Sequence, residues 1–324
     1  MQVLITGGAG FIGSHLAEKL LAQSHAVTVI DDLSTGSMGN IAHLMANRSF
    51  RFVRESVRNE MMMTALVERT DMIYHLAAAV GVQLIVDRPV HTIETNIHGS
   101  EVVLSLANKF RTPVLIASTS EVYGKSDDVP FREDADVVYG CTAFSRWSYA
   151  ASKAIDEFLA LAYYQENRLP VVICRFFNTV GPRQTGAYGM VVPRFVQAAL
   201  RNEPIRVFGT GRQSRCFACV FDVVDAVTKL MATPAAAGGV YNIGSTESIT
   251  IEALARKVIE MTGSRSTIEV ISYEKAYGRS FDDMMRRVPD LTRIEQAIGY
   301  KPRHSLSDTL TLVIEHERAA MAKR

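Results

Sequence analysis

The chain has 324 residues, of which 48% are hydrophobic and 21% charged, and its formal net charge at pH 7 is +1. This length favours about two domains and suffices to bury a sizeable core. The near-neutral charge gives no reason to expect nucleic acid or an anionic membrane as a partner. No apolar run reaches the ~18 residues of a membrane span. Residues 2–6 already have the pattern of a strand, so we expect no signal peptide and a cytoplasmic location.

The first half of the chain alternates short β-branched runs with amphipathic segments. Strands separated by helices in this way indicate parallel βαβ units. We therefore predict an α/β fold, with a doubly wound parallel sheet that helices cover on both faces. The expected strands are 2–6, 26–31, 50–53, 72–76, 113–118 and 171–177, and the helices between them include 14–23, 99–110 and 149–166.

After Asn178 the pattern becomes less regular, with turns at 181–183 and 209–211. We predict a main domain at 1–177, to which about 218–243 returns with a further strand at 240–243. A smaller α/β C-terminal substrate domain would comprise 178–217 and 244–324 and lie over the carboxyl edge of the sheet, where such folds bind ligands. Helices are expected at 189–202, 222–233 and 250–262.

The four cysteines do not predict a metal site. Cys216-x-x-Cys219 has no second pair and no histidine at the spacing of a zinc site. We interpret both as small buried side chains in or beside a strand.

A glycine-rich segment, Gly7-Gly8-Ala9-Gly10-Phe11-Ile12-Gly13, connects the first expected strand to a helix. Glycine clusters alone are weak evidence, but this one has the strand before and the helix after that a Rossmann-like dinucleotide site requires. The glycines permit the tight turn and let the backbone approach a pyrophosphate at the helix N-terminus.

Asp31 and Asp32 end the second expected strand. A carboxylate at this place accepts hydrogen bonds from the adenosine ribose and repels a 2′-phosphate. No arginine occurs between Ser14 and Asn47 to pair with such a phosphate. The sequence therefore predicts NAD as the cofactor in preference to NADP.

Tyr149 and Lys153 are four residues apart in an expected helix and so share one face. A tyrosine phenol has a pKa of ~10, and a nearby ammonium group together with the positive nicotinamide ring favours the phenolate. The phenolate can take a proton from a sugar hydroxyl as NAD takes the hydride. An isolated Tyr-x-x-x-Lys pair is more often a solvated helix face. Its place after the fifth strand, which Thr119 ends, favours the catalytic interpretation.

These motifs resemble the extended short-chain dehydrogenase/reductases that act on nucleotide sugars, over essentially the whole chain. The resemblance implies that Thr119, Tyr149 and Lys153 are catalytic. It also implies an NAD site made by Gly7, Gly10, Phe11, Ile12, Asp31, Asp32, Leu76, Ala77 and Ala78, together with Tyr149 and Lys153. It further implies a UDP-sugar site that includes Ser120, Asn178, Arg183, Arg215 and Arg287.

Glu121 follows Thr119-Ser120, and hydride transfer alone does not need its carboxylate. In the family, many 4-epimerases have a small residue here, whereas dehydratases and decarboxylases commonly carry a carboxylate. Three segments resemble UDP-glucuronate decarboxylases and imply a catalytic role for Arg287. They are Arg146-Trp147-Ser148-Tyr149, Arg215-Cys216-Phe217, and Tyr277-Gly278 followed by Arg287-x-Pro289-Asp290.

The chemistry of a decarboxylase fits these residues. Oxidation at C4 of UDP-glucuronate gives a 4-keto intermediate whose C6 carboxylate is β to the ketone and leaves readily. Thr119 and Tyr149 can hydrogen-bond the C4 oxygen. Glu121 and Arg287 would position the carboxylate or handle the C5 proton, and the sequence does not choose between them.

The alternative is a 4-epimerase of a UDP-hexose or a UDP-uronate (UDP-glucose/galactose or UDP-glucuronate/galacturonate), and a 4,6-dehydratase comes third. The loop 78–82 resembles epimerases, Arg287 would serve an epimerase by binding diphosphate, and Glu121 could be a structural acid. A non-catalytic dinucleotide-binding protein is not expected, because such proteins usually lose the tyrosine or lysine.

The family also pairs the helices that match 99–110 and 149–166 into a four-helix dimer interface. Their apolar residues permit a homodimer, although burial within a monomer would leave the same pattern. These residues are Val102, Val103, Leu106, Phe158, Leu159 and Ala162.

Overall fold

The computed structural model describes residues 1–187, 189–277 and 284–322. Its centre is a seven-stranded sheet in the order β11-β6-β5-β4-β1-β2-β3, and every pair of neighbouring strands is parallel. The strand order reverses direction between β1 and β4. The predicted Rossmann-like fold is confirmed. The strands are β1 (Gln2–Thr6), β2 (Ala26–Ile30), β3 (Phe50–Val53), β4 (Met72–His75), β5 (Val114–Thr119), β6 (Val171–Phe176) and β11 (Gly239–Ile243).

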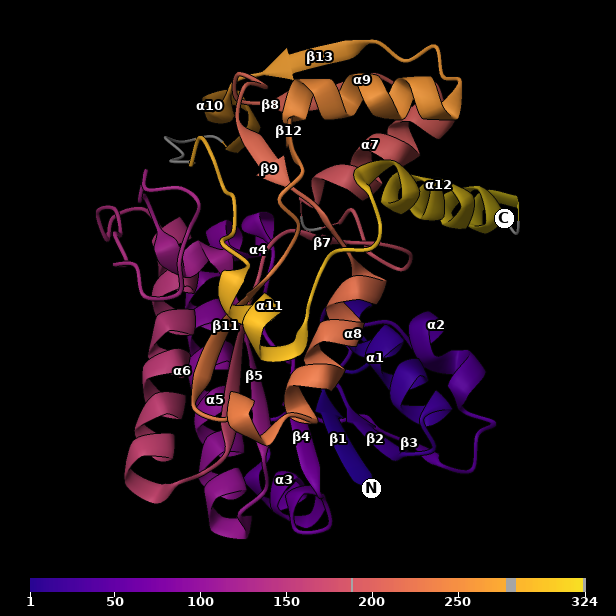
Figure 1. Ribbon diagram of the computed structural model, residues 1–324. Helices are drawn as coiled ribbons and strands as arrows, with labels where there is room; N and C mark the ends of the chain where they lie inside the picture. The colour runs from indigo at the N-terminus through magenta and orange to yellow at the C-terminus, as the bar shows by residue number, and fades with distance from the viewer. Residues whose placement is uncertain (188, 278–283, 323–324) are drawn as a thin grey trace.

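Helices cover both faces of this sheet, as Figure 1 shows. One hydrophobic cluster joins the sheet to α1 and α8, and a second joins the opposite face to α3, α5 and α6. Shorter helices lie in the connections. The helices of this part are α1 (Phe11–Ala22), α2 (Met38–Ile41), α3 (Glu60–Val67), α4 (Val82–Asp87), α5 (Pro89–Phe110), α6 (Arg146–Asn167), α8 (Val220–Met231) and α11 (Thr292–Ile298), with 3₁₀ turns at Ala42–Leu44, Ser120–Tyr123 (η2) and Pro234–Ala236.

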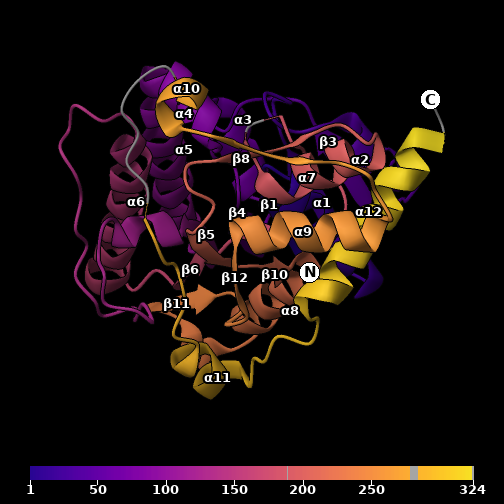
Figure 2. The ribbon, with the colours of Figure 1, turned by 90° about the horizontal axis from the view of Figure 1, so that it is seen from above.

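A smaller group of elements lies above the carboxyl ends of the sheet strands in Figure 1 and is seen from above in Figure 2. A third hydrophobic cluster joins α7, α9 and α12 to β8. The two-stranded pairs β8–β13, β9–β12 and β7–β10 complete this part. Its elements are β7 (Thr179–Val180), α7 (Val191–Leu200), β8 (Ile205–Phe208), β9 (Ser214–Cys216), β10 (Ala218–Cys219), β12 (Ser248–Thr250), α9 (Ile251–Thr262), β13 (Ile268–Ile271), α10 (Tyr273–Tyr277) and α12 (Leu306–Ala322). Ile294 of α11 packs in the same cluster as α1 and α8, so we propose the predicted domain boundaries with Thr292–Ile298 moved from the substrate domain to the main domain.

Helix α5 begins ten residues before the expected start at residue 99. Pro89 occupies its first turn, where the missing N–H costs no hydrogen bond. Between there and residue 99, the buried polar residues Thr92 and Asn96 interrupt the apolar pattern, which hides the helix. Val103 lies in the core, and Val102 and Leu106 pack against the same cluster. These three side chains therefore stabilise the monomer and are not an open dimer surface.

A buried ion pair fixes the carboxyl ends of β5 and β6. Arg175 on β6 donates to Glu157 on α6, with Nη2 2.7 Å from Oε2, and Ser118 on β5 donates to the same carboxylate. The Arg175 guanidinium also lies 4.7 Å from the centre of the Tyr123 ring, and the Tyr123 hydroxyl donates to Asn242 on β11 at 2.7 Å. Three neighbouring strands are thus joined at the edge where Thr119 and η2 emerge.

We expect Glu157→Gln to lower the free energy of unfolding by about 3 kcal/mol, because it leaves the buried guanidinium of Arg175 without its counter-charge. Urea denaturation followed by circular dichroism measures this loss. The matched control is Glu101→Gln on α5, whose side chain is 62% exposed, and its effect should stay within about 0.5 kcal/mol. Equal losses in the two variants would refute a structural role for the Glu157–Arg175 pair.

Candidate active site

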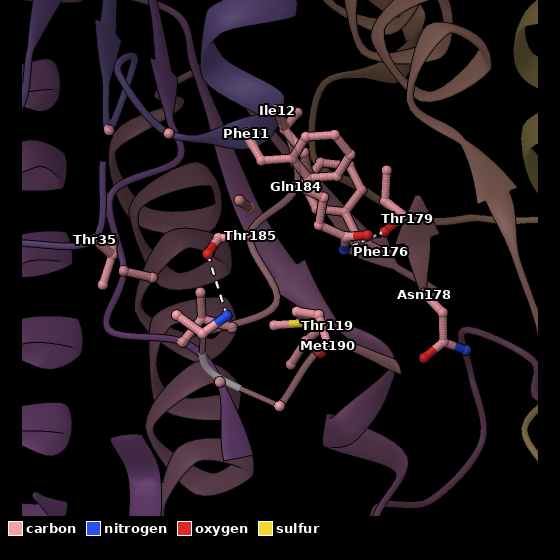
Figure 3. A pocket seen from close by; sticks show the side chains of 18 of the residues that line it. Phe11, Ile12, Thr35, Thr119, Phe176, Asn178, Thr179, Gln184, Thr185 and Met190 are labelled. Atoms are coloured by element: carbon pink, nitrogen blue, oxygen red, sulfur yellow. Dashed lines mark hydrogen bonds between the residues drawn. The ribbon is translucent and has the colours of Figure 1, made fainter. Parts of the chain in front are cut away.

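A cavity of about 790 Å³ lies at the carboxyl edge of the sheet, between the sheet and the smaller group of elements. The glycine-rich turn, the ends of β2, β4 and β5, and the segment after β6 line it. In Figure 3, Phe11 on α1, Thr119 at the end of β5 and Asn178 after β6 surround this space. Residues far apart in the sequence therefore share one pocket.

The glycine-rich turn fits a dinucleotide. Gly7 has φ +70°, and a Cβ there would lie 2.7 Å from the backbone nitrogen of Ala77. A Cβ on Gly13 would lie 2.5 Å from the Gly7 carbonyl oxygen, so α1 could not pack against the turn. A Cβ on Gly10 would meet only the Gly7 oxygen, at 3.0 Å, because its other side is open. Backbone can thus approach a pyrophosphate at the N-terminus of α1.

The two acids after β2 lie in the same pocket wall. The Asp31 carboxylate accepts hydrogen bonds from the backbone N–H groups of Ala9 (3.0 Å) and Leu33 (2.8 Å), which fastens the glycine-rich turn to the end of β2. Asp32 accepts from the N–H of Ser34 at 2.9 Å. Of the remaining predicted NAD contacts, Lys153 is not among the residues that line the cavity. Those that do line it are Phe11, Ile12, Leu76, Ala77, Ala78 and Tyr149.

Thr119 and Tyr149 meet at the floor of the pocket. Thr119 is the last residue of β5, and its hydroxyl accepts the N–H of Glu121 at 3.2 Å. Tyr149 lies in the first turns of α6 and hydrogen-bonds Thr119. Burial and the negative charge of Glu121 raise the pKa of Tyr149 above its ordinary value, and the bond to Thr119 opposes this. The phenol therefore keeps its proton until further positive charge arrives.

Lys153 lies one turn beyond Tyr149 on α6, as predicted, but it is engaged with a residue that the sequence analysis did not single out. Its ammonium group donates to Asp156 at 2.7 Å. Both side chains are buried, with exposed fractions of 2% and 1%. Asp156 therefore compensates the charge that was expected to favour the phenolate.

Glu121 is held between two arginines. Its carboxylate lies 2.6 Å from Nη2 of Arg287 and 3.3 Å from Nη2 of Arg146. Arg287 also donates to the Ser120 hydroxyl at 3.4 Å. Burial alone would raise the pKa of Glu121, but the charges of Arg146 and Arg287 lower it to about 2. The carboxylate is therefore ionised throughout the physiological pH range.

Arg146 is a pocket residue that the site prediction omitted. It begins α6, is buried and lines the cavity beside Glu121. Its guanidinium also lies 5.8 Å from the centre of the Trp147 ring. The sequence signal for Arg146 is the segment Arg146-Trp147-Ser148-Tyr149, which resembles decarboxylases.

The predicted substrate residues Asn178, Arg183 and Arg215 all line the cavity. The Asn178 amide donates to the Cys216 carbonyl at 3.0 Å, and Nη1 of Arg215 donates to the Ser214 carbonyl at 2.8 Å. The Arg183 guanidinium instead binds Glu18 at 2.6 Å and Ser14 at 3.3 Å, both on α1. Arg183 thus connects the segment after β6 to the helix of the glycine-rich turn.

Several other features that the sequence suggested are not part of the pocket that the structure describes. Gly278 and the side chain of Tyr277 lie outside the described residues. Within the described ranges, His, Cys, Asp and Glu form no group of three or more that could hold a metal ion. Cys216 and Cys219 are buried free thiols. None of the helices in the described part of the chain is long and apolar enough to cross a membrane.

Comparison with known proteins identifies the family. The family model described as GDP-mannose 4,6 dehydratase matches residues 4–313. The chain belongs to this family. It is an NAD-dependent enzyme of the extended short-chain dehydrogenase/reductase type, which confirms the predicted enzyme class and cofactor.

The sequence relatives include two kinds of decarboxylase. The chain is 40% identical over 315 residues to the UDP-N-acetyl-alpha-D-glucosaminuronate decarboxylase of Bacillus cytotoxicus, covering 97% of each chain. It is 34% identical over 320 residues to UDP-glucuronic acid decarboxylase 2 of Arabidopsis thaliana, covering 98% of this chain and 68% of the relative.

Solved structures with the same fold include two epimerases. The UDP-glucose 4-epimerase of Thermotoga maritima, solved with UDP-glucose, is 30% identical with a TM-score of 0.90, over 99% of this chain and 100% of that one. The UDP-glucuronic acid 4-epimerase of Bacillus cereus, solved with UDP-glucuronic acid and NAD, is 27% identical with a TM-score of 0.89 over the same shares.

We expect Glu121→Gln to lower the free energy of unfolding at pH 7 by about 3 kcal/mol, because two buried guanidinium groups lose their counter-charge. The pKa of Glu121 is about 2 in the folded protein against 4.5 ordinarily. Its stabilisation is therefore complete above about pH 4.5 and is lost as the pH falls toward about 2. The difference between wild type and variant should shrink across this window, as measured by denaturant titrations at several pH values.

Glu68→Gln, at an exposed position after α3, is the control and should follow wild type at every pH. A difference between wild type and Glu121→Gln that does not change between pH 5 and pH 2 would contradict the depressed pKa.

Proposed function

We propose that the protein is an NAD-dependent decarboxylase of a UDP-linked uronic acid, with UDP-glucuronate as the substrate that the sequence predicted. The observation that carries this proposal is the cluster of Glu121, Arg146 and Arg287 beside Thr119 and Tyr149. Two arginines and one carboxylate leave a net positive charge in the pocket. Such a place suits a second carboxylate, that of the sugar, through charge-assisted hydrogen bonds.

The residues that would hold NAD are the glycine-rich turn, Asp31 and Asp32, and the wall formed by 76–78. When bound, NAD supplies a hydride acceptor for C4 of the sugar and a positive ring near the catalytic tyrosine. The added positive charge opposes the burial and the Glu121 charge that raise the pKa of Tyr149, so the phenol first releases its own proton to solvent. The phenolate then takes the proton of the C4 hydroxyl. Thr119 orients the same oxygen by its hydrogen bond to Tyr149.

The 4-keto intermediate places the C6 carboxylate β to a ketone, so its C5–C6 bond breaks with release of carbon dioxide. Thr119 and the newly protonated Tyr149 donate hydrogen bonds to the C4 oxygen and stabilise the enolate. Glu121, with a pKa of about 2, has no proton to deliver at neutral pH, so the enolate takes its C5 proton from solvent water. Its role in this proposal is to hold Arg287 and Arg146 against the sugar carboxylate.

The relatives support decarboxylation and leave two substrates to compare. By their names, the two sequence relatives reported above act on UDP-N-acetylglucosaminuronate and on UDP-glucuronate, which differ at C2. A UDP-uronate 4-epimerase is the second candidate, because the epimerase from Bacillus cereus has the same fold over 99% of this chain. That reaction uses Thr119, Tyr149 and Lys153 but keeps the C6 carbon.

The deciding experiment follows UDP-glucuronate and UDP-N-acetylglucosaminuronate, each labelled with carbon-13 at C6, by NMR in the presence of the protein and NAD. We expect labelled carbon dioxide and bicarbonate to appear from one or both, because the cluster at Glu121 is placed to bind the departing carboxylate. Tyr149→Phe, the control, should release less than a hundredth of the label, since general base catalysis contributes about 10²–10⁴-fold. A label that stays on the sugar while the 4-epimer accumulates would overturn the decarboxylase proposal.

We also propose that the enzyme acts as a homodimer in the cytoplasm. Exposed apolar side chains on α5 and α6 support the dimer: Val90, Ile93, Ile155 and Phe158, of which Phe158 is 66% exposed. An apolar group of this kind on two neighbouring helices is typical of an interaction surface. The cytoplasmic location rests on the sequence expectation alone, and fractionation of cells that express the protein tests it.

Phe158→Arg should shift the protein from dimer to monomer, because a charged side chain would be buried without a partner at the interface. Sedimentation velocity at several concentrations measures the change. Val270→Arg on β13, an apolar position of similar exposure in the smaller part (58% exposed), is the control and should leave the dimer intact. A wild-type protein that sediments as a monomer at all concentrations would exclude the homodimer.

A further inference from the structure

The buried partner of Lys153 has no place in the reaction described so far. Lys153 and Asp156 lie three residues apart on α6, with Nζ 2.7 Å from Oδ2. Both side chains are almost completely buried. The pair therefore differs from solvent-exposed ion pairs, which contribute little to stability. Burying two charges is costly unless further hydrogen bonds satisfy them.

Helix α5 supplies polar groups opposite this pair. Ser100 on α5 is completely buried and hydrogen-bonds Asp156. One turn earlier, the amide of Asn96 donates to Ser152 on α6 at 3.2 Å. The two helices therefore meet through a polar seam that lies between otherwise apolar surfaces.

The seam continues into the sheet. Nε2 of His75, the last residue of β4, lies 3.1 Å from the Ser100 hydroxyl, and its Nδ1 lies 2.8 Å from the Thr6 hydroxyl. The Thr6 oxygen also accepts the N–H of Ala77 at 3.2 Å. Thr6 immediately precedes the glycine-rich turn, and Ala77 lines the cavity. Hydrogen bonds thus run from the pocket wall to Asp156.

The number of protons fixes the direction of these bonds. A hydroxyl donates one hydrogen bond, and an ionised carboxylate only accepts. Ser100 must therefore donate to Asp156 and accept from His75, whose Nε2 carries the proton. His75 is neutral, because burial and then the charge of Lys153 lower its pKa to about 3. Nδ1 of His75 is left to accept from Thr6.

We propose that Asp156 is a positioning residue for catalysis: it is the buried counter-ion of Lys153, oriented through Ser100 and His75 by the strand ends beneath the dinucleotide turn. The proposal rests on the role assigned above to Tyr149 and Lys153. Asp156 compensates the lysine charge and so sets how readily Tyr149 loses its proton.

Several other charges face these groups. Glu121 from η2 and Arg287 from the segment after residue 284 act on Tyr149, and both are paired with each other. Arg146 at the start of α6 pairs with Glu121. Glu157 lies beside Asp156 and is held by Arg175 from β6. Substitution of Asp156 alone leaves all of these pairs in place.

The test compares Asp156→Asn with wild type in the NAD-bound protein. The ultraviolet absorbance of tyrosinate is followed against pH, and the same titration of the matching Tyr149→Phe protein is subtracted to isolate Tyr149. We expect Tyr149 to titrate about one pH unit lower in Asp156→Asn, because the ammonium charge is no longer compensated. The acidic limb of kcat/KM should move by the same amount, about tenfold in proton concentration.

Two further variants separate positioning from simple support. Asp156→Glu keeps the charge and should titrate close to wild type. Ser100→Ala removes a donor from the carboxylate, which then opposes Lys153 more strongly, so Tyr149 should titrate at a higher pH. An unchanged Tyr149 titration in Asp156→Asn, or in Ser100→Ala if Asp156→Asn does not fold, would overturn the proposal. The absorbance result does not depend on the sugar substrate, so it stands apart from the outcome of the decarboxylation test.

Discussion

All seven strands of the central sheet are parallel, and this constraint positions the cofactor pocket and the residues at the strand ends. Parallel strands end at one edge, so residues near positions 7, 31, 76, 119 and 178 converge although they are widely separated in the chain. The reversal of strand order between β1 and β4 opens the crevice at that edge. The smaller group of elements closes the crevice from above and contributes the arginines at 215 and 287.

Helix α6 carries the proposed catalytic residues Tyr149 and Lys153 and three further buried charged residues on successive turns. Arg146 and Tyr149 face the pocket, Lys153 and Asp156 form a buried pair, and Glu157 pairs with the sheet through Arg175. Buried pairs of this kind contribute little net stability, but loss of one partner is strongly destabilising. The buried pairs of α6 therefore fix the positions of their side chains and add little to the free energy of unfolding. This suits a site in which a tyrosine must meet a sugar hydroxyl at hydrogen-bond distance.

Tyr149 lies between two clusters of buried charges at the bottom of the pocket. On one side Glu121 lies between two arginines and stays ionised. On the other side Asp156 forms a buried ion pair with Lys153. Tyr149 lies between these clusters, and both carboxylates raise its pKa. The proton on the tyrosine is thus retained by the protein alone, which connects proton removal to the arrival of a positively charged cofactor.

The sequence by itself determined the strands, the sheet type and the glycine-rich turn, because each depends on local periodicity or on short spacing along the chain. It also singled out Thr119, Tyr149 and Lys153, for which we propose the catalytic roles. Through family resemblance it also predicted that Glu121 and Arg287 act together on the sugar carboxylate or the C5 proton. It missed the first half of α5, where Thr92 and Asn96 are polar but buried.

Only the tertiary structure decided the partners of the buried charges. Arg146 meets Glu121, and Asp156 meets Lys153 and Ser100. Arg183 lines the cavity and also pairs with Glu18 on α1. A charged side chain in a sequence looks the same whether it is solvated or buried. Its pKa and its role depend on the groups that packing brings within a few ångströms, and most of these come from distant parts of the chain.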